Sequence, residues 1–416
     1  MILNTLLLVA SPLLAPAPAM PDLLAIKVDR AETVSDGTIR NAVILVENGK
    51  IAVIGEDLAI ERGIPVIDMG PNSVAMPGLV NAYSRIGMDS RGGNDSQPGN
   101  SALAELYPAH EDYDEVLETG VTTLGLYPPG NGIPGRAVAI KPRGSSAEDM
   151  LLSDDAYLKI TLRSDSSSKK MIRNGFEEAD KYIEDDKKAR DKWEKAVEKA
   201  KKDKKKKKDD KEGDDKKDDP DVGPYEPPTP NPDAKAFQDL RNGELRALMC
   251  IDSAGDYLHL LDALGEEKIS WDLRVTVTRR LNLFYVKKEL GELGCRVVME
   301  PILTNHPNTR RLRNLPAEVS EAGAKLVLIP RSDRLSDQRD WLHNTGEMIG
   351  AGLSRETALR AMTLEPAEML GVEGRVGSLT AGKDANILFF QGNPFEPDTK
   401  VQAVMLEGEI VFGELN

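Results

Sequence analysis

The chain has 416 residues, of which 40% are hydrophobic and 30% are charged, and its formal net charge is −15. This length and apolar content allow a sizeable core, which favours one large domain with a small accessory one. The negative charge argues against nucleic acid and anionic membrane surfaces as partners, because a surface that binds phosphates must be basic.

The N-terminal segment 1–19 is typical of a secretory signal peptide. An apolar run is followed by the small residues Ala17, Pro18 and Ala19, as at a cleavage site. No positive charge precedes the run, so a disordered or partly buried N-terminus is the alternative. Elsewhere no stretch approaches the roughly 20 apolar residues of a membrane span. We therefore expect a secreted or periplasmic protein without a membrane span.

Both ends of the chain predict short strands. Two apolar runs flank Asn48 and Gly49, and this dipeptide favours the positive φ angles of a type I′ hairpin. Neither end could bury its apolar face alone. We therefore expect a small composite β-sandwich domain formed by residues 20–75 and 376–416. Its strands are expected at 41–47, 50–55, 386–390, 401–406 and 409–412.

Between these ends, residues 76–375 alternate β-rich apolar runs with helical patterns, which indicates an α/β fold. Eight runs predict a (β/α)8 TIM barrel, whose parallel strands are covered on both faces. A doubly wound open sheet is the alternative. The eight runs are 73–83, 122–127, 137–141, 158–162, 247–252, 273–279, 296–303 and 325–333.

Residues 177–235 interrupt the barrel pattern with a segment rich in Lys, Asp, Glu and then Pro. Such a segment cannot bury enough apolar surface to order itself, so we expect a disordered insertion between strands four and five. Opposite charges at i,i+4 spacing could extend a helix through Trp193 and Val197. The lysines at 204–208 suggest polyanion binding, but the interleaved aspartates favour a solvated spacer.

The two cysteines, Cys250 and Cys295, are expected to be core thiols. Cys250 is late in one predicted strand and Cys295 directly precedes another. In a parallel barrel these positions are at opposite ends, which is too far apart for a disulfide.

The motifs that flank the predicted barrel resemble those of the amidohydrolase superfamily. The likeness spans roughly 24–162 and 240–413, and within the superfamily it is greatest for the imidazolonepropionase-related hydrolases. This resemblance implies the barrel fold and a hydrolase acting on C–N bonds other than peptide bonds. The matching stretches are 49–55, 66–68 and 76–85 before the barrel, and 352–363, 366–367, 370–371 and 377–385 after it.

The same resemblance implies zinc or another divalent metal at the carboxyl ends of the barrel strands. The family's ligands would be a His-x-His pair on strand one, one His on each of strands five and six, and an Asp on strand eight that also acts as a base. A metal-bound water would then become hydroxide and attack the scissile bond.

This sequence departs from that ligand set. Tyr83 and Arg85 occupy the His-x-His positions, Cys250 stands on strand five and Arg279 on strand six, and only Asp333 is retained. Arginine has no lone pair to offer and would repel a dication. A Cys250–Asp333 zinc site would have too few ligands. We therefore expect no metal cofactor and a catalytically inactive binding or structural protein, a pseudoenzyme.

Three interpretations of the altered site remain open, besides an active metal-dependent amidohydrolase with a rearranged site. The arginines could fill the interior and neutralise Asp333. They could bind a small anionic ligand, with Tyr83 donating a hydrogen bond. Metal-free catalysis could use Cys250 as nucleophile or Asp333 as base.

Two further features receive no site assignment. The glycine-rich stretch 130–135 lacks the Lys-Ser/Thr ending of a phosphate loop and predicts a strand-to-strand turn. Lys141 and Lys159 lie on predicted strands, and a carboxylated lysine has no purpose without metal-binding histidines.

Overall fold

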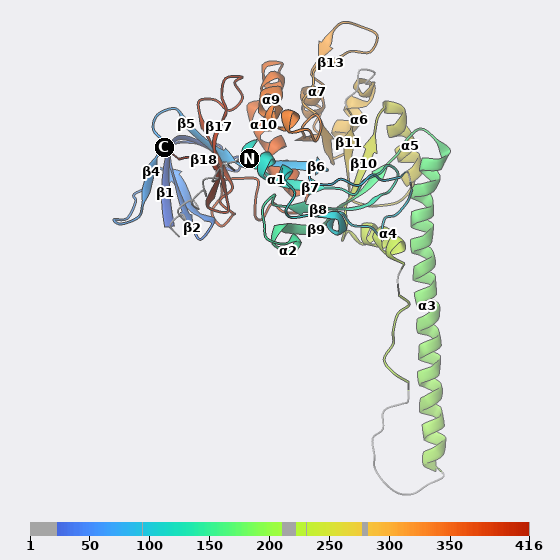
Figure 1. Ribbon diagram of the computed structural model, residues 1–416. Coiled ribbons are helices and arrows are strands. Elements are labelled where there is room, and N and C mark those ends of the chain that lie inside the picture. The colour runs from blue at the N-terminus through green and yellow to red at the C-terminus, as the bar shows by residue number, and fades with distance from the viewer. Residues whose placement is uncertain (1–22, 94, 210–221, 230, 277–281, 416) are drawn as a thin grey trace, which may run out of the picture.

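The computed structural model describes residues 23–93, 95–209, 222–229, 231–276 and 282–415. The expected signal peptide at 1–19 lies outside these residues. The structure comprises a β-domain, a barrel and a long helix that extends away from the barrel (Figure 1). None of its described helices is both long and apolar enough to cross a membrane.

The β-domain combines both ends of the chain, as predicted. Its strands form one continuous sheet in the order β18-β17-β16-β5-β1-β2-β3, with β4 paired to β1. The expected hairpin is present, with φ angles of 51° at Asn48 and 78° at Gly49. The strands are β1 (Leu23–Glu32), β2 (Thr38–Glu47), β3 (Lys50–Glu56), β4 (Val66–Asp68), β5 (Ser73–Pro77), β16 (Ile387–Gln391), β17 (Val401–Leu406) and β18 (Glu409–Gly413).

The second sheet is a nearly closed eight-stranded barrel, in the order β15-β12-β11-β10-β9-β8-β7-β6. Helices α10 and α11 contact both of its end strands, β6 and β15. The strands are β6 (Leu79–Ser84), β7 (Val121–Leu126), β8 (Gly135–Ile140), β9 (Leu151–Thr161), β10 (Ala247–Ile251), β11 (Trp271–Val275), β12 (Arg296–Met299) and β15 (Lys325–Leu328).

The prediction that all barrel strands are parallel is wrong for β8, which is antiparallel to both β7 and β9. A short turn joins β7 to β8, and only antiparallel neighbours can be connected without a long crossover. Gly130 and Gly132 have positive φ in this turn, so the predicted strand-to-strand turn at 130–135 is confirmed.

The stretch 73–83, predicted as one strand, is divided between the two sheets. β5 pairs with β16 of the β-domain, whereas β6 pairs with β7 of the barrel. Gly78 stands between them, and a Cβ there would lie 2.0 Å from Thr122 Oγ1. The chain therefore changes sheets at the residue that allows this close approach.

Helices surround the barrel, and a small β13–β14 hairpin lies near its carboxyl end (Figure 1). The helices are η1 (Ala102–Glu105), α1 (Asp112–Glu118), α2 (Ala147–Met150), α3 (Ser166–Asp209), α4 (Pro232–Asn242), α5 (Ala254–Leu264), η2 (Leu283–Val286), α6 (Lys287–Glu292), α7 (Leu315–Glu321), α8 (Leu335–Arg339), α9 (Trp341–Gly350), α10 (Arg355–Met362) and α11 (Leu364–Met369); the hairpin is β13 (Thr304–Asn305) and β14 (Leu312–Arg313).

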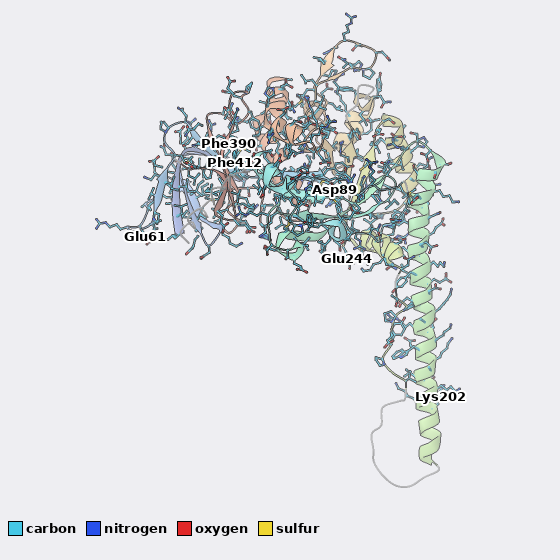
Figure 2. The ribbon with its side chains drawn as sticks, in the orientation of Figure 1. Glu61, Asp89, Lys202, Glu244, Phe390 and Phe412 are labelled. Carbon is cyan, nitrogen blue, oxygen red and sulfur yellow. The ribbon has the colours of Figure 1, made fainter. Side chains whose placement is uncertain are left out.

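The segment 177–235, predicted as a disordered insertion between strands four and five, is at that place but is largely helical where described. Helix α3 has 44 residues and extends past the barrel, so that Lys202 lies far from the β-domain (Figure 2). The proline-rich chain returns along it: Trp193 Nε1 donates to the Gly223 carbonyl at 2.8 Å, and the Tyr225 hydroxyl donates to Asp186. Trp193 and Tyr225 are half-buried and contact each other edge-on, a local contact that composition alone did not indicate.

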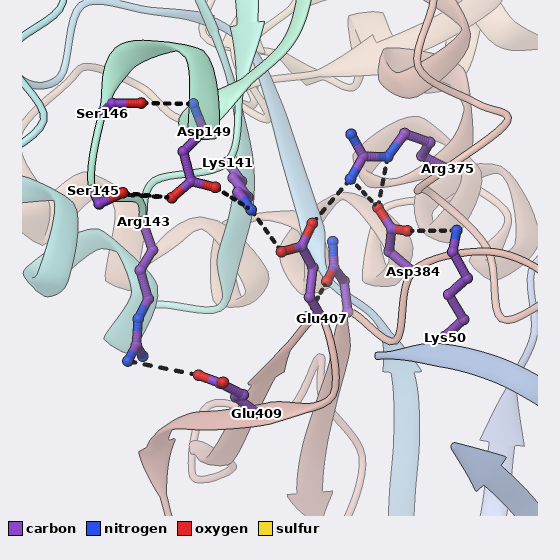
Figure 3. A network of polar contacts seen from close by, with 11 residues as sticks. Lys50, Lys141, Arg143, Ser145, Ser146, Asp149, Arg375, Asp384, Glu407 and Glu409 are labelled. Carbon is purple, nitrogen blue, oxygen red and sulfur yellow. Dashed lines mark hydrogen bonds and ion pairs between the residues drawn. The ribbon is translucent and has the colours of Figure 1, made fainter. Parts of the chain in front are cut away.

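A polar network joins the β-domain to the barrel (Figure 3). Arg375 contacts Asp384 at 2.8 Å and Glu407 at 2.9 Å. Glu407 also accepts from Lys141 at 2.6 Å, and Lys50 lies 3.2 Å from Asp384. Carboxylates from the C-terminal segment are thus held by cations from both parts of the molecule.

Candidate functional site

Alternate residues of each barrel strand point into the barrel. On β10, Leu248 and Cys250 belong to the inner apolar cluster, whereas Met249 packs in the outer one. Strand register places Lys159 beside Leu248 and Arg274 beside Cys250. The end where the parallel strands finish, here called the barrel mouth, therefore carries inward-facing polar residues from β9, β10 and β11.

A buried ion pair occupies one side of the barrel mouth. Arg274 donates to the Glu300 carboxylate, which directly follows β12. The Arg274 guanidinium also lies over the Tyr83 ring, with 5.2 Å from Cζ to the ring centroid. This arrangement stabilises a cation in the interior through a carboxylate and an aromatic face.

Two tyrosines and a lysine lie next to this ion pair. Tyr83 and Tyr127 stack with their ring centroids 4.0 Å apart, and Lys159 Nζ lies 4.3 Å from the Tyr127 centroid. Burial raises the pKa of Tyr83, and it raises that of Tyr127 to about 12, so both hydroxyls stay protonated near neutral pH. Lys159 is 4% exposed and donates to the Gly130 carbonyl at 2.8 Å.

Cys250 is a free, buried thiol, as is Cys295, which confirms both predictions. Burial raises the pKa of Cys250, and this outweighs the opposite effect of the nearby Lys159 and Arg274 charges. A buried thiol that remains protonated is a poor nucleophile. The position therefore favours packing over covalent catalysis.

Asp333 is placed differently from the prediction. β15 ends at Leu328, so Asp333 lies in the loop before α8 and is exposed. It accepts from Ser84 Oγ at 2.9 Å. Desolvation of the carboxyl by the surrounding protein raises its pKa, while the backbone N–H of Arg85, the Ser84 hydroxyl and the Arg85 charge lower it. Because the residue reaches solvent, water screens these effects.

The structure brings together Tyr83 and Cys250 at the barrel mouth, and joins Arg85 to Asp333. Arg279 lies outside the described residues, and β11 ends at Val275. Lys159 has no predicted site role, and Tyr127, Arg274 and Glu300 are not among the predicted site residues. A charged residue within an otherwise apolar strand indicates two of these four, Lys159 and Arg274.

These residues do not fit the divalent metal that the family resemblance implies. An arginine and a lysine cannot coordinate a dication while protonated, and their charges oppose one. Within the described part of the chain, no three His, Cys, Asp or Glu residues are grouped so that they could hold a metal ion. No chemical step at this site is therefore assigned to a metal.

Comparisons with known proteins agree with this architecture. Residues 337–412 match the model of the amidohydrolase family. The structure of an amidohydrolase from Thermotoga maritima superposes with a TM-score of 0.72 at 22% identity, over 94% of this chain and 100% of that one.

A Xaa-Pro dipeptidase with bound methionine gives a TM-score of 0.52 at 13% identity, over 93% of this chain and 99% of that one. Molinate hydrolase gives 0.50 at 14% identity, over 94% of each chain. No curated protein sequence matches. Residues 337–412 are thus similar in sequence to the amidohydrolase family, and the chain as a whole shares the fold of these hydrolases.

Proposed function

We propose that this protein is a metal-free derivative of the hydrolase scaffold that binds a small anionic ligand at the barrel mouth. The observation that carries the proposal is the charge of this region. Three basic side chains (Arg85, Lys159 and Arg274) lie close enough for their charges to interact, whereas two carboxylates are nearby: Glu300 pairs with Arg274, and Asp333 lies beside Arg85. An excess of positive charge in a partly desolvated site favours an anion.

Unused hydrogen-bonding capacity supports the same ligand class. The Nε atoms of Arg85 and Arg274 are buried without a hydrogen-bond partner among the described residues. A buried donor left without an acceptor costs free energy, and a carboxylate or phosphate oxygen would satisfy it.

Calorimetric titration with acetate, lactate and phosphate tests this proposal. We expect one anion to bind the native protein and Lys159→Met to weaken it about tenfold, which corresponds to about 1.4 kcal/mol. Arg143→Met is the matched control, because Arg143 is half exposed and its ion pair with Glu409 of the β-domain is long, at 3.8 Å. Null isotherms for all anions would end the proposal.

Elemental analysis of the same protein addresses catalysis. We expect substoichiometric zinc, iron and manganese, since cations occupy the interior. One bound metal per chain would instead favour the active metal-dependent amidohydrolase with a rearranged site.

A further inference from the structure

Lys159 differs from the other lysine that sequence analysis noted on a barrel strand. Its Nζ donates to the Gly130 carbonyl, and no carboxylate among the described residues forms an ion pair with it. Lys141, by contrast, lies 2.6 Å from Glu407 and 3.4 Å from Asp149. One buried lysine thus lacks the counter-charge that normally accompanies burial.

The surroundings of Lys159 raise its fraction of neutral amine above that of an ordinary lysine. Burial lowers its pKa, and the positive charges of Arg85 and Arg274 lower it further, against an opposing effect of Cys250. For Lys141 the two carboxylates outweigh burial and raise the pKa. A neutral amine has the lone pair that a protonated amine lacks, so only Lys159 of the two is prepared to act as a nucleophile.

We propose that Lys159 forms an imine with the carbonyl group of a small 2-oxo acid bound at the barrel mouth. This inference rests on the proposed anion site, since the ligand's carboxylate would be held by the free Nε donors of Arg85 and Arg274. Both arginines lie close enough to Lys159 for their charges to lower its pKa, so a carboxylate held by them would bring the neighbouring carbonyl carbon toward the amine.

The reaction balances without a redox partner. The Nζ lone pair forms a bond to the carbonyl carbon and the C=O π electrons move to oxygen, giving a carbinolamine. Proton transfer from nitrogen to oxygen and loss of one water then leave the C=N double bond. The products are one imine and one water, and nothing is oxidised or reduced.

Cys250 is the competing nucleophile, and its chemistry is distinguishable. Its thiol is buried and remains protonated, as argued above. Addition of a thiol to the same carbonyl would give a hemithioketal, which borohydride reagents do not convert into a stable adduct. Reductive trapping therefore reports the amine alone.

The test is to incubate the native protein with pyruvate and sodium cyanoborohydride at pH 7, followed by intact-mass analysis and peptide mapping. We expect one secondary-amine adduct per chain, located at Lys159. Labelling of Lys141 should be slower, because its two carboxylates raise the pKa of this amine whereas burial lowers that of Lys159. Lys159→Arg, checked for native circular dichroism, should remove the adduct while keeping a cation.

The outcomes separate this inference from the anion site on which it rests. Binding of pyruvate and of its non-carbonyl analogue lactate, without an adduct, would overturn the imine and leave the anion site intact. Absence of both binding and adduct would overturn both. Equal labelling of Lys159 and surface lysines, or an adduct that persists in Lys159→Arg, would also overturn the imine.

Discussion

Arg274 and Glu300 form an ion pair across the strand ends of β11 and β12, and their side chains are 7% and 8% exposed. Removing one partner of a buried ion pair takes a counter-charge away from the other and costs about 3–5 kcal/mol. We therefore expect Arg274→Met to lower the free energy of unfolding by that amount in urea denaturation.

The double variant Arg274→Met/Glu300→Gln is the control for this prediction. Without either charge, much of the lost stability should return, because neutral side chains of similar size need no counter-charge. Equal stability of the single and double variants would show that the guanidinium contributes through packing only.

Tyr127 should make the protein sensitive to alkaline pH. Its folded pKa is raised to about 12, whereas an unfolded tyrosine titrates near pH 10. The neutral form is thus favoured in the folded state, and this stabilisation is fully present below pH 10 and lost between about pH 10 and 12.

We expect Tyr127→Phe to lose less stability than the native protein between pH 9 and 11.5, as measured by urea unfolding at each pH. Tyr113→Phe is a matched comparison, because burial raises the pKa of Tyr113 to about 12 outside the barrel mouth. Parallel pH profiles for native protein and Tyr127→Phe would contradict the prediction.

Replacing Gly175 with alanine should destabilise the protein, although Gly→Ala usually stabilises a helix. Gly→Ala in an exposed helix interior stabilises by about 1 kcal/mol. Here a Cβ would lie 2.1 Å from Cζ of Phe237, a fully buried ring that packs edge-on against Phe176. We expect Gly175→Ala to destabilise by about 1–3 kcal/mol through overpacking. In Gly350→Ala, where the Cβ meets no neighbour, thermal unfolding should show no loss.

Arg375 should contribute to docking of the β-domain. Arg375→Met removes the contacts to Asp384, which is 5% exposed, and to Glu407. Hydrogen bonds to charged groups contribute about 1.5–3 kcal/mol, so we expect a loss in that range in urea unfolding. Arg143→Met, which removes an exposed 3.8 Å pair, should cost under about 1 kcal/mol. Comparable losses would argue against the network in Figure 3 as a docking contact.

The sequence predicted much of the fold because local patterns and burial agreed. The Asn48-Gly49 hairpin and the alternating strands of the barrel follow from turn chemistry and apolar periodicity. The reversal of β8 was not predictable from its own residues, since a buried apolar strand has the same composition in either direction.

The site was harder to predict because strand ends determine it. The sixth barrel strand was predicted to continue to Arg279, but it ends at Val275. The inward-facing residue next to Cys250 is therefore Arg274 and not Arg279. The predicted strand end at Asp333 lies beyond Leu328, where β15 ends, so Asp333 belongs to the following loop. The ion pair with Glu300 depends on contacts between strands, which no local pattern reports.

Helix α3 is anchored to two barrel helices near its N-terminal end, so a small tilt there would move its far end. Lys169 and Arg173 contact Asp262 of α5, and Arg241 of α4 contacts Asp180, so the helix is clamped on two sides near its start. Beyond that clamp, the turns from Lys181 to Asp209 extend roughly 43 Å at 1.5 Å per residue. Over that length, a tilt of about 5° at the clamp would displace the far end of α3 by roughly 4 Å. A small shift between α4 and α5 would therefore move the far end of α3 by several ångströms, which a label at Lys202 could report.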